Sequence, residues 1–119
     1  MTYVDGLVVP VRKNKLAAYS RMAMKFGKVW REHGALEVHE CVADDVPLGK
    51  RTSFPRSVKL KRGETVIFAW VIYRSRAQRD RVMAKVMKDK RVAKMMSGKD
   101  IPFDGKRMIV GGFKTFLEL

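Results

Sequence analysis

The positions of apolar residues along the chain repeat with two periods, and these periods predict its helices and strands. In residues 14–33, five apolar side chains are spaced three or four positions apart, which places them on one face of a helix. Asn14 is a suitable residue to cap the start of this helix, and Gly34 is suitable to end it. Residues 14–33 are therefore predicted to form a helix with one face in the core. That face consists of Leu16, Tyr19, Ala23, Phe26 and Trp30.

Four segments have the composition of β-strands. Residues 3–11 are rich in β-branched side chains and end near Pro10, which predicts a first strand. Residues 36–42 alternate apolar with polar side chains, as a strand with one buried face does. Residues 65–73 are apolar on both faces, which is typical of a central strand. Residues 107–119 are predicted to form the last strand.

Two further helices are predicted between the third and fourth strands, capped by Ser75 and by Asp89. The order strand, helix, strand, strand, helix, strand predicts an α+β protein of the ferredoxin-like βαββαβ type. Such a fold has an antiparallel four-stranded sheet with its helices on one face, and its third strand lies between the first and the second. A chain of 119 residues can form one core but is too short for two. We therefore expect a single domain over residues 1–119.

One face of this sheet is expected to need a partner. The third and last strands carry more large apolar side chains than two helices can cover: Phe68, Trp70, Tyr73, Phe113 and Phe116. An exposed apolar surface of that size favours association. The simplest cover is the sheet of a second copy, which predicts a homodimer.

The chain is strongly basic, with 26 Lys and Arg against 12 Asp and Glu and a formal net charge of +14. The densest segment runs from Arg74 to Lys99 and contains ten basic residues against two acidic ones. It is either a solvated helix face or an anion-binding surface. A weak, salt-sensitive contact with nucleic acid is expected in the second case. RNA-recognition motifs share the βαββαβ order, but Val66 and Ile67 stand where their third strand has a basic residue and a glycine.

Several classes of function are not expected. No segment approaches the ~20 apolar residues of a membrane helix, and the start of the chain has no secretion signal, so a cytoplasmic location is expected. Cys41 is the only cysteine, which excludes a disulfide within one chain. The two histidines lack the close spacing typical of metal ligands. No glycine-rich phosphate loop joins a strand to a helix, and we expect neither a metal nor a cofactor.

Four residues are candidates for a site on the sheet. Asp5 interrupts an apolar strand, and burial of its carboxylate would raise the pKa, as a general base requires; the alternative is a solvated or hydrogen-bonded carboxylate. His39 lies on the polar face of the second strand with Glu37 and Cys41, where it is either a catalytic acid or base or an exposed polar residue. Tyr3 and Trp70 either line a pocket for a planar ligand or belong to the core of the dimer.

Five segments of the sequence carry a resemblance to a known family: residues 3–6, 29–37, 40–45, 53–55 and 102–108. Over nearly its whole length the chain is similar to the YbaA-like family of bacterial proteins of unknown function, which resembles the dimeric α/β-barrel superfamily. In that superfamily two ferredoxin-like sheets pack face to face, and its other branches include cofactor-free monooxygenases, haem-degrading enzymes and muconolactone isomerases. The resemblance implies the fold and the dimer, with a small-molecule-binding protein or a cofactor-free enzyme ahead of an RNA-binding protein.

Overall fold

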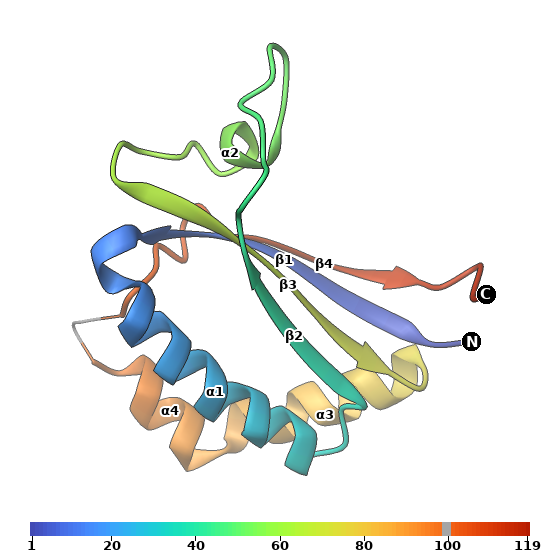
Figure 1. Cartoon of the computed structure of the whole chain (residues 1–119). Coiled ribbons are helices and arrows are strands. Elements are labelled where there is room, and N and C mark those ends of the chain that lie inside the picture. The colour runs from blue at the N-terminus through green and yellow to red at the C-terminus, as the bar shows by residue number, and fades with distance from the viewer. Residues whose placement is uncertain (99–100) are drawn as a thin grey trace.

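A computed structural model describes residues 1–98 and 101–119 of the chain (Figure 1). Its strands and helices follow one another in the predicted order, and two short helical segments are present in addition. In order they are β1 (Tyr3–Arg12), the 3-10 turn η1 (Lys13–Lys15), α1 (Leu16–Glu32), β2 (Glu37–Val42), α2 (Phe54–Ser57), β3 (Glu64–Tyr73), α3 (Arg76–Lys88), α4 (Lys90–Met96) and β4 (Ile109–Lys114).

The strands form one antiparallel sheet in the order β2-β3-β1-β4. The predicted α+β class and the four-stranded antiparallel sheet are thus confirmed for the described residues. β3 lies between β1 and β2, so Asp5 of β1 is opposite Val71 of β3, while Trp70 of β3 is opposite both Gly6 and His39. This register decides which candidate residues share a face.

The helices α1, α3 and α4 lie along one face of the sheet, and α2 lies on the other side with the loops around it (Figure 1). We call the helix-covered face the inner face and the opposite one the outer face. The core lies between the inner face and the helices, where Tyr73, Val82 and Val86 are almost completely buried. No described helix is long and apolar enough to span a membrane.

Three boundaries differ from the prediction. The first helix begins at Leu16, because residues 13–15 form a 3-10 turn, so Asn14 is not its cap. The last strand ends at Lys114 rather than at residue 119. Its neighbour in the sheet, β1, begins at Tyr3, which is opposite Lys114. The long connection after β2 contains α2, whose first turn is capped by the Ser53 hydroxyl accepting from the Arg56 amide at 3.0 Å.

The predicted caps of the later helices are confirmed. The Ser75 hydroxyl accepts from the amide of Gln78 at 3.1 Å at the start of α3. The Asp89 carboxylate accepts from the amide of Arg91 at 2.9 Å at the start of α4. These caps satisfy amides that have no partner within the helix, and they set the directions in which α3 and α4 cross the sheet.

Candidate functional site

The four predicted site residues lie on two opposite faces of the sheet. Side chains alternate between the faces along a strand. Tyr3 and Asp5 project from the inner face toward α3, where Arg79 contacts both of them. Trp70 precedes the buried Val71 and therefore projects from the outer face, with His39 beside it. Their side chains form two pairs on opposite faces, although Asp5 and His39 both border the cavity that lies between the sheet and the helices.

Asp5 is an almost completely buried carboxylate, with 6% of its surface exposed. Arg79 donates to its Oδ1 at 3.0 Å and to the Tyr3 hydroxyl at 3.3 Å, and the guanidinium lies 5.0 Å from the centre of the Tyr3 ring. Burial raises the pKa of Asp5, and the neighbouring Arg79 opposes that effect. Asp5 is thus both buried and hydrogen-bonded, which combines features of the two alternatives that the sequence left open.

His39 and Trp70 form a stacked pair on the outer face. Their ring centres are 4.7 Å apart and their planes differ by 17°. The His39 Nε2 atom lies 3.2 Å from the Glu37 carboxylate, and the Phe68 ring continues the aromatic row at 5.6 Å from Trp70. Phe68 is 42% exposed and Phe113 on β4 is 63% exposed. This face is an open aromatic surface rather than a closed pocket.

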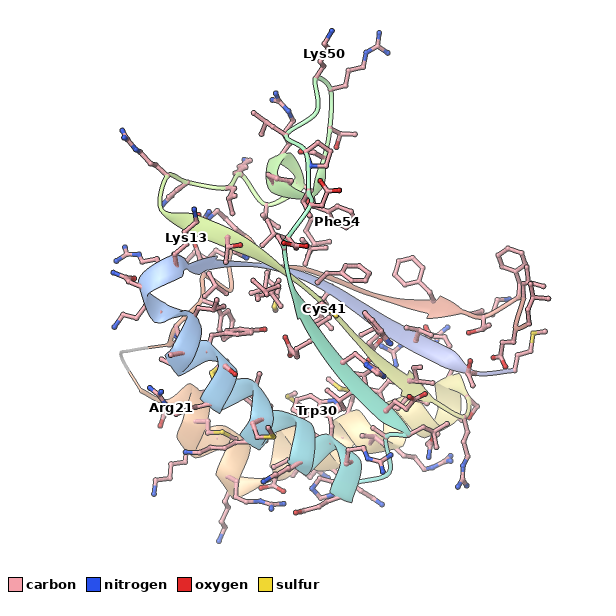
Figure 2. All side chains as sticks on the ribbon, viewed as in Figure 1. Lys13, Arg21, Trp30, Cys41, Lys50 and Phe54 are labelled. Carbon is pink, nitrogen blue, oxygen red and sulfur yellow. The ribbon has the colours of Figure 1, made fainter. Side chains whose placement is uncertain are left out.

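A cavity of about 390 Å³ lies between the inner face and the helices, and we call it the inner cavity. Trp30 of α1 lies between that helix and the sheet and forms part of the cavity wall (Figure 2). The walls of the cavity are mainly apolar and include several methionines. They comprise Leu7, Val9, Ala69 and Val71 of the sheet, Ala23, Phe26 and Trp30 of α1, and Met83, Met87, Val92 and Met96 of α3 and α4.

Polar groups enter this apolar cavity at two places. Asp5 forms one of them, and a pair of side chains, Tyr19 and Glu40, forms the other. The Tyr19 hydroxyl donates to Glu40 Oε1 at 2.7 Å. Burial raises the pKa of both groups, and the hydrogen bond between them partly offsets this rise for Glu40. A carboxyl group with a raised pKa, hydrogen-bonded to a phenol, can accept or hold a proton at the cavity wall.

The Tyr19–Glu40 pair was missed in the sequence, although the alternation of β2 contains the signal for it. Val38 and Val42 occupy the face of β2 that was assigned to the core, and Glu40 lies between them with the same parity. A carboxylate on the apolar face of a strand is more informative than one on the polar face. Glu37 and His39, which were singled out instead, lie on the opposite face of β2 from Glu40, and all three residues are exposed to solvent on this edge strand.

The inner cavity adjoins a groove between α1 and the edge strand β2. This groove has a volume of about 1000 Å³ and shares Tyr19, Ala23, Val38 and Glu40 with the cavity. At Gly27 the helix comes so close to β2 that an added Cβ would lie 3.4 Å from Val38. We call the part that the groove and the inner cavity share, which Ala23 and Glu40 line, the entrance of the inner cavity.

The basic segment predicted from Arg74 to Lys99 lies on α3 and α4, and Lys99 itself is outside the described residues. Two of its arginines have acidic partners: Arg79 holds Asp5, and Arg91 holds Glu32 at 2.6 Å. Most of its other cations are exposed. Within residues 1–98 and 101–119, no group of three or more His, Cys, Asp or Glu side chains is placed to hold a metal ion.

Comparisons with other proteins place the chain in a family. A protein from Escherichia coli K12, "Uncharacterized protein YbaA", is 46% identical over 118 residues, which is 99% of each chain. A protein of the same name from Shigella flexneri matches equally well. Among solved structures, the de novo designed protein Foldit4 is similar, with a TM-score of 0.50 and 13% identity over 97% of this chain and 99% of that one. That likeness concerns the fold alone.

The family model described as "Protein of unknown function (DUF1428)" matches residues 2–105. This match covers β1, the helices and the sheet strands up to β3, so it includes Asp5, Tyr19 and Glu40. With the full-length identity to the YbaA proteins, it shows that the chain belongs to the DUF1428 family.

Proposed function

We propose that this protein binds a small, largely apolar molecule in the inner cavity. The observation that carries the proposal is the combination of apolar walls with one hydrogen-bonded polar pair, the buried Tyr19 and the solvent-exposed Glu40. Ligand sites are typically concave, mostly apolar and supplied with a few placed polar groups. A volume of about 390 Å³ lies within the usual range of such sites.

The polar pair defines what the ligand must carry. Glu40 accepts hydrogen bonds, and the Tyr19 hydroxyl can donate to the ligand when it turns away from Glu40. A ligand with one hydroxyl, carbonyl or amine group at one end satisfies these groups, while its apolar body contacts the methionines and aromatic rings of the walls. The flexible methionine side chains adjust to the shape of such a body.

We infer further that residues 1–119 form a single cytoplasmic ferredoxin-like domain of the dimeric α/β-barrel type. The strand order β2-β3-β1-β4 and the placement of α1, α3 and α4 on one face support the domain type. The exposed Phe68, Ile109 and Phe113 on the outer face support a homodimer, because they give a second sheet an apolar surface to cover. In such a dimer the two inner cavities remain separate, one under each set of helices.

The binding proposal is tested with Trp30 as a reporter, because it lines the inner cavity. The chain has two tryptophans, so Trp70→Phe leaves Trp30 as the only one. We expect the neutral fluorophore N-phenyl-naphthylamine to quench Trp30 emission by energy transfer and to do so saturably. In the same background, Ala23→Phe fills the entrance and should abolish this saturable quenching.

The matched control is Ala17→Phe, which makes the same change at an exposed position of the same helix. It should leave the binding of the fluorophore unchanged. Thermal unfolding of each variant shows whether it is folded before binding is measured. Equal binding by the Ala23→Phe and Ala17→Phe variants would refute the inner cavity as the site.

A further inference from the structure

A second recess lies where β1 runs into α1, apart from the inner cavity. It has a volume of about 870 Å³ and is bounded by η1, by residues 61–64 before β3 and by residues 101–104. The Lys13 amide donates to the Gly63 carbonyl at 2.9 Å, which ties the turn before β3 to the start of the helix. Lys13 stands at the junction of β1 and α1 (Figure 2).

Six cationic side chains line this recess, and we call it the cationic recess. One is the partly buried Arg107, and the other five are exposed: Arg12, Lys13, Lys15, Lys61 and Arg62. Among the residues that the structure describes, none of the five forms an ion pair with an acidic side chain. They come from two neighbouring segments, residues 12–15 and 61–62, which the pairing of Arg12 with Glu64 and the Lys13–Gly63 hydrogen bond hold side by side.

Both acidic residues of the cationic recess pair with the same arginine, whose single charge balances only one of them. Arg107 lies 2.6 Å from the Glu64 carboxylate and 2.8 Å from that of Asp104. The side chains of Arg107 and Glu64 are only 14% and 7% exposed, so this pair is a fixed part of the floor. The nearby Arg107 lowers the pKa of Glu64 and keeps the carboxylate ionised in the pair. With six cations against two carboxylates, the lining of the recess has a net charge of +4.

The start of α1 adds to this unbalanced charge. Its first turn contains no acidic residue, no side chain caps it, and Lys13 and Lys15 lie just before it. Cations at the positive end of a helix dipole are unfavourable. The arrangement is costly in an empty recess and becomes favourable when an anion lies among the lysines.

We propose that the cationic recess binds the di- or triphosphate group of a small molecule. Arg and Lys side chains are the usual partners of phosphate oxygens. Five exposed cations and about 870 Å³ exceed what a single phosphate group needs, and they suit a short chain of phosphates. A free inorganic triphosphate and a nucleoside triphosphate share this chemistry. The recess is bounded on three sides, which favours a small molecule over a nucleic-acid strand.

The test is a calorimetric titration of the full chain with inorganic triphosphate, with a parallel titration with ATP. We expect saturable binding with one triphosphate per chain. The double variant Lys13→Ala/Lys15→Ala should bind about tenfold more weakly, because two exposed charge contacts are lost. The control Lys88→Ala/Lys94→Ala removes the same charge from exposed positions of α3 and α4 and should bind as the unchanged chain does.

Amide NMR spectra locate the site independently of affinity. Inorganic triphosphate should shift the amide signals of residues 12–16 and 61–64 more than those of α3 and α4. If both double variants bound inorganic triphosphate equally weakly, the binding would depend on net charge alone, and the proposal would be overturned. Tighter binding of a single-stranded RNA than of ATP, with shifts outside the recess, would overturn it as well. Tighter ATP than triphosphate binding identifies a nucleotide as the ligand.

Discussion

Replacing Arg79 with methionine should destabilise the protein through the carboxylate that it leaves behind. Arg79→Met keeps the apolar stem that covers Tyr3 and removes the charge that lies 3.0 Å from Asp5. Removing one partner of a fully buried ion pair costs ~3–5 kcal/mol. Because the Arg79 side chain is 22% exposed, we expect a smaller loss of unfolding free energy, about 2 kcal/mol at pH 7.

The loss should depend on pH in a defined direction. Burial raises the pKa of Asp5, and removal of Arg79 raises it further. An acid with a raised pKa in the folded state binds its proton more tightly there than in the unfolded chain. The folded state therefore loses stability as the pH rises from the pKa of Asp5 in the unfolded chain to its higher pKa in the folded protein. The cost of Arg79→Met should be small near pH 4, where Asp5 is protonated in the variant, and should grow towards pH 7.

Urea unfolding between pH 4 and pH 7, followed by tryptophan fluorescence, measures this dependence. Arg81→Met is the matched control, because Arg81 is an exposed residue of the same helix. It should change the free energy of unfolding by no more than ~0.5 kcal/mol at any of these pH values. If Arg79→Met costs as little as Arg81→Met, or costs the same at pH 4 and pH 7, the buried-carboxylate argument is wrong.

Three further predictions concern the inner cavity, the assembly and the charge. Glu40→Gln should unfold at higher urea than the unchanged chain at pH 7 and at the same urea at pH 4, because burial raises the pKa of Glu40 and glutamine can still accept from Tyr19. In light scattering the chain should have twice its mass of 13.7 kDa, and Phe113→Glu should shift it toward the monomer; a monomeric unchanged chain would refute the sheet-to-sheet dimer. Binding of the basic segment between Arg74 and Lys99 to RNA should be independent of sequence and should collapse between ~50 and 200 mM salt; persistence at the higher salt would show a specific RNA contact.

The elements of the fold were predictable because each rests on a local signal. The three- and four-residue spacing of α1 and the doubly apolar β3 appear directly in the sequence. The end of β4 at Lys114 depends instead on how far the edge of β1 extends, which is a property of the partner strand. The 3-10 turn before Leu16 likewise follows from the contact of Lys13 with Gly63, which is 50 positions away along the chain.

The candidate site was only partly predictable, because a shared face requires the register as well as the strand order. β1 and β3 are separated by α1 and β2, so no hairpin turn fixes their register. A shift by one residue would have placed Asp5 beside Trp70. In the structure Asp5 is opposite Val71 and faces the helices, while Trp70 faces outward. Within a single strand, the alternation of side chains between the two faces can be read from the sequence. It places Glu40 on the same face of β2 as Val38 and Val42.

The acidic residues also explain why so basic a chain exposes so much unbalanced charge. Nine of the eleven acidic side chains that the structure describes form a hydrogen bond or an ion pair, and many of these contacts join distant elements. Each ion pair removes one negative and one positive charge together, so this pairing leaves the formal net charge of +14 unchanged. That excess is carried by cations for which the chain has too few carboxylates, and it makes the surface strongly positive. The nine are Asp5, Glu32, Glu37, Glu40, Glu64, Asp80, Asp89, Asp104 and Glu118.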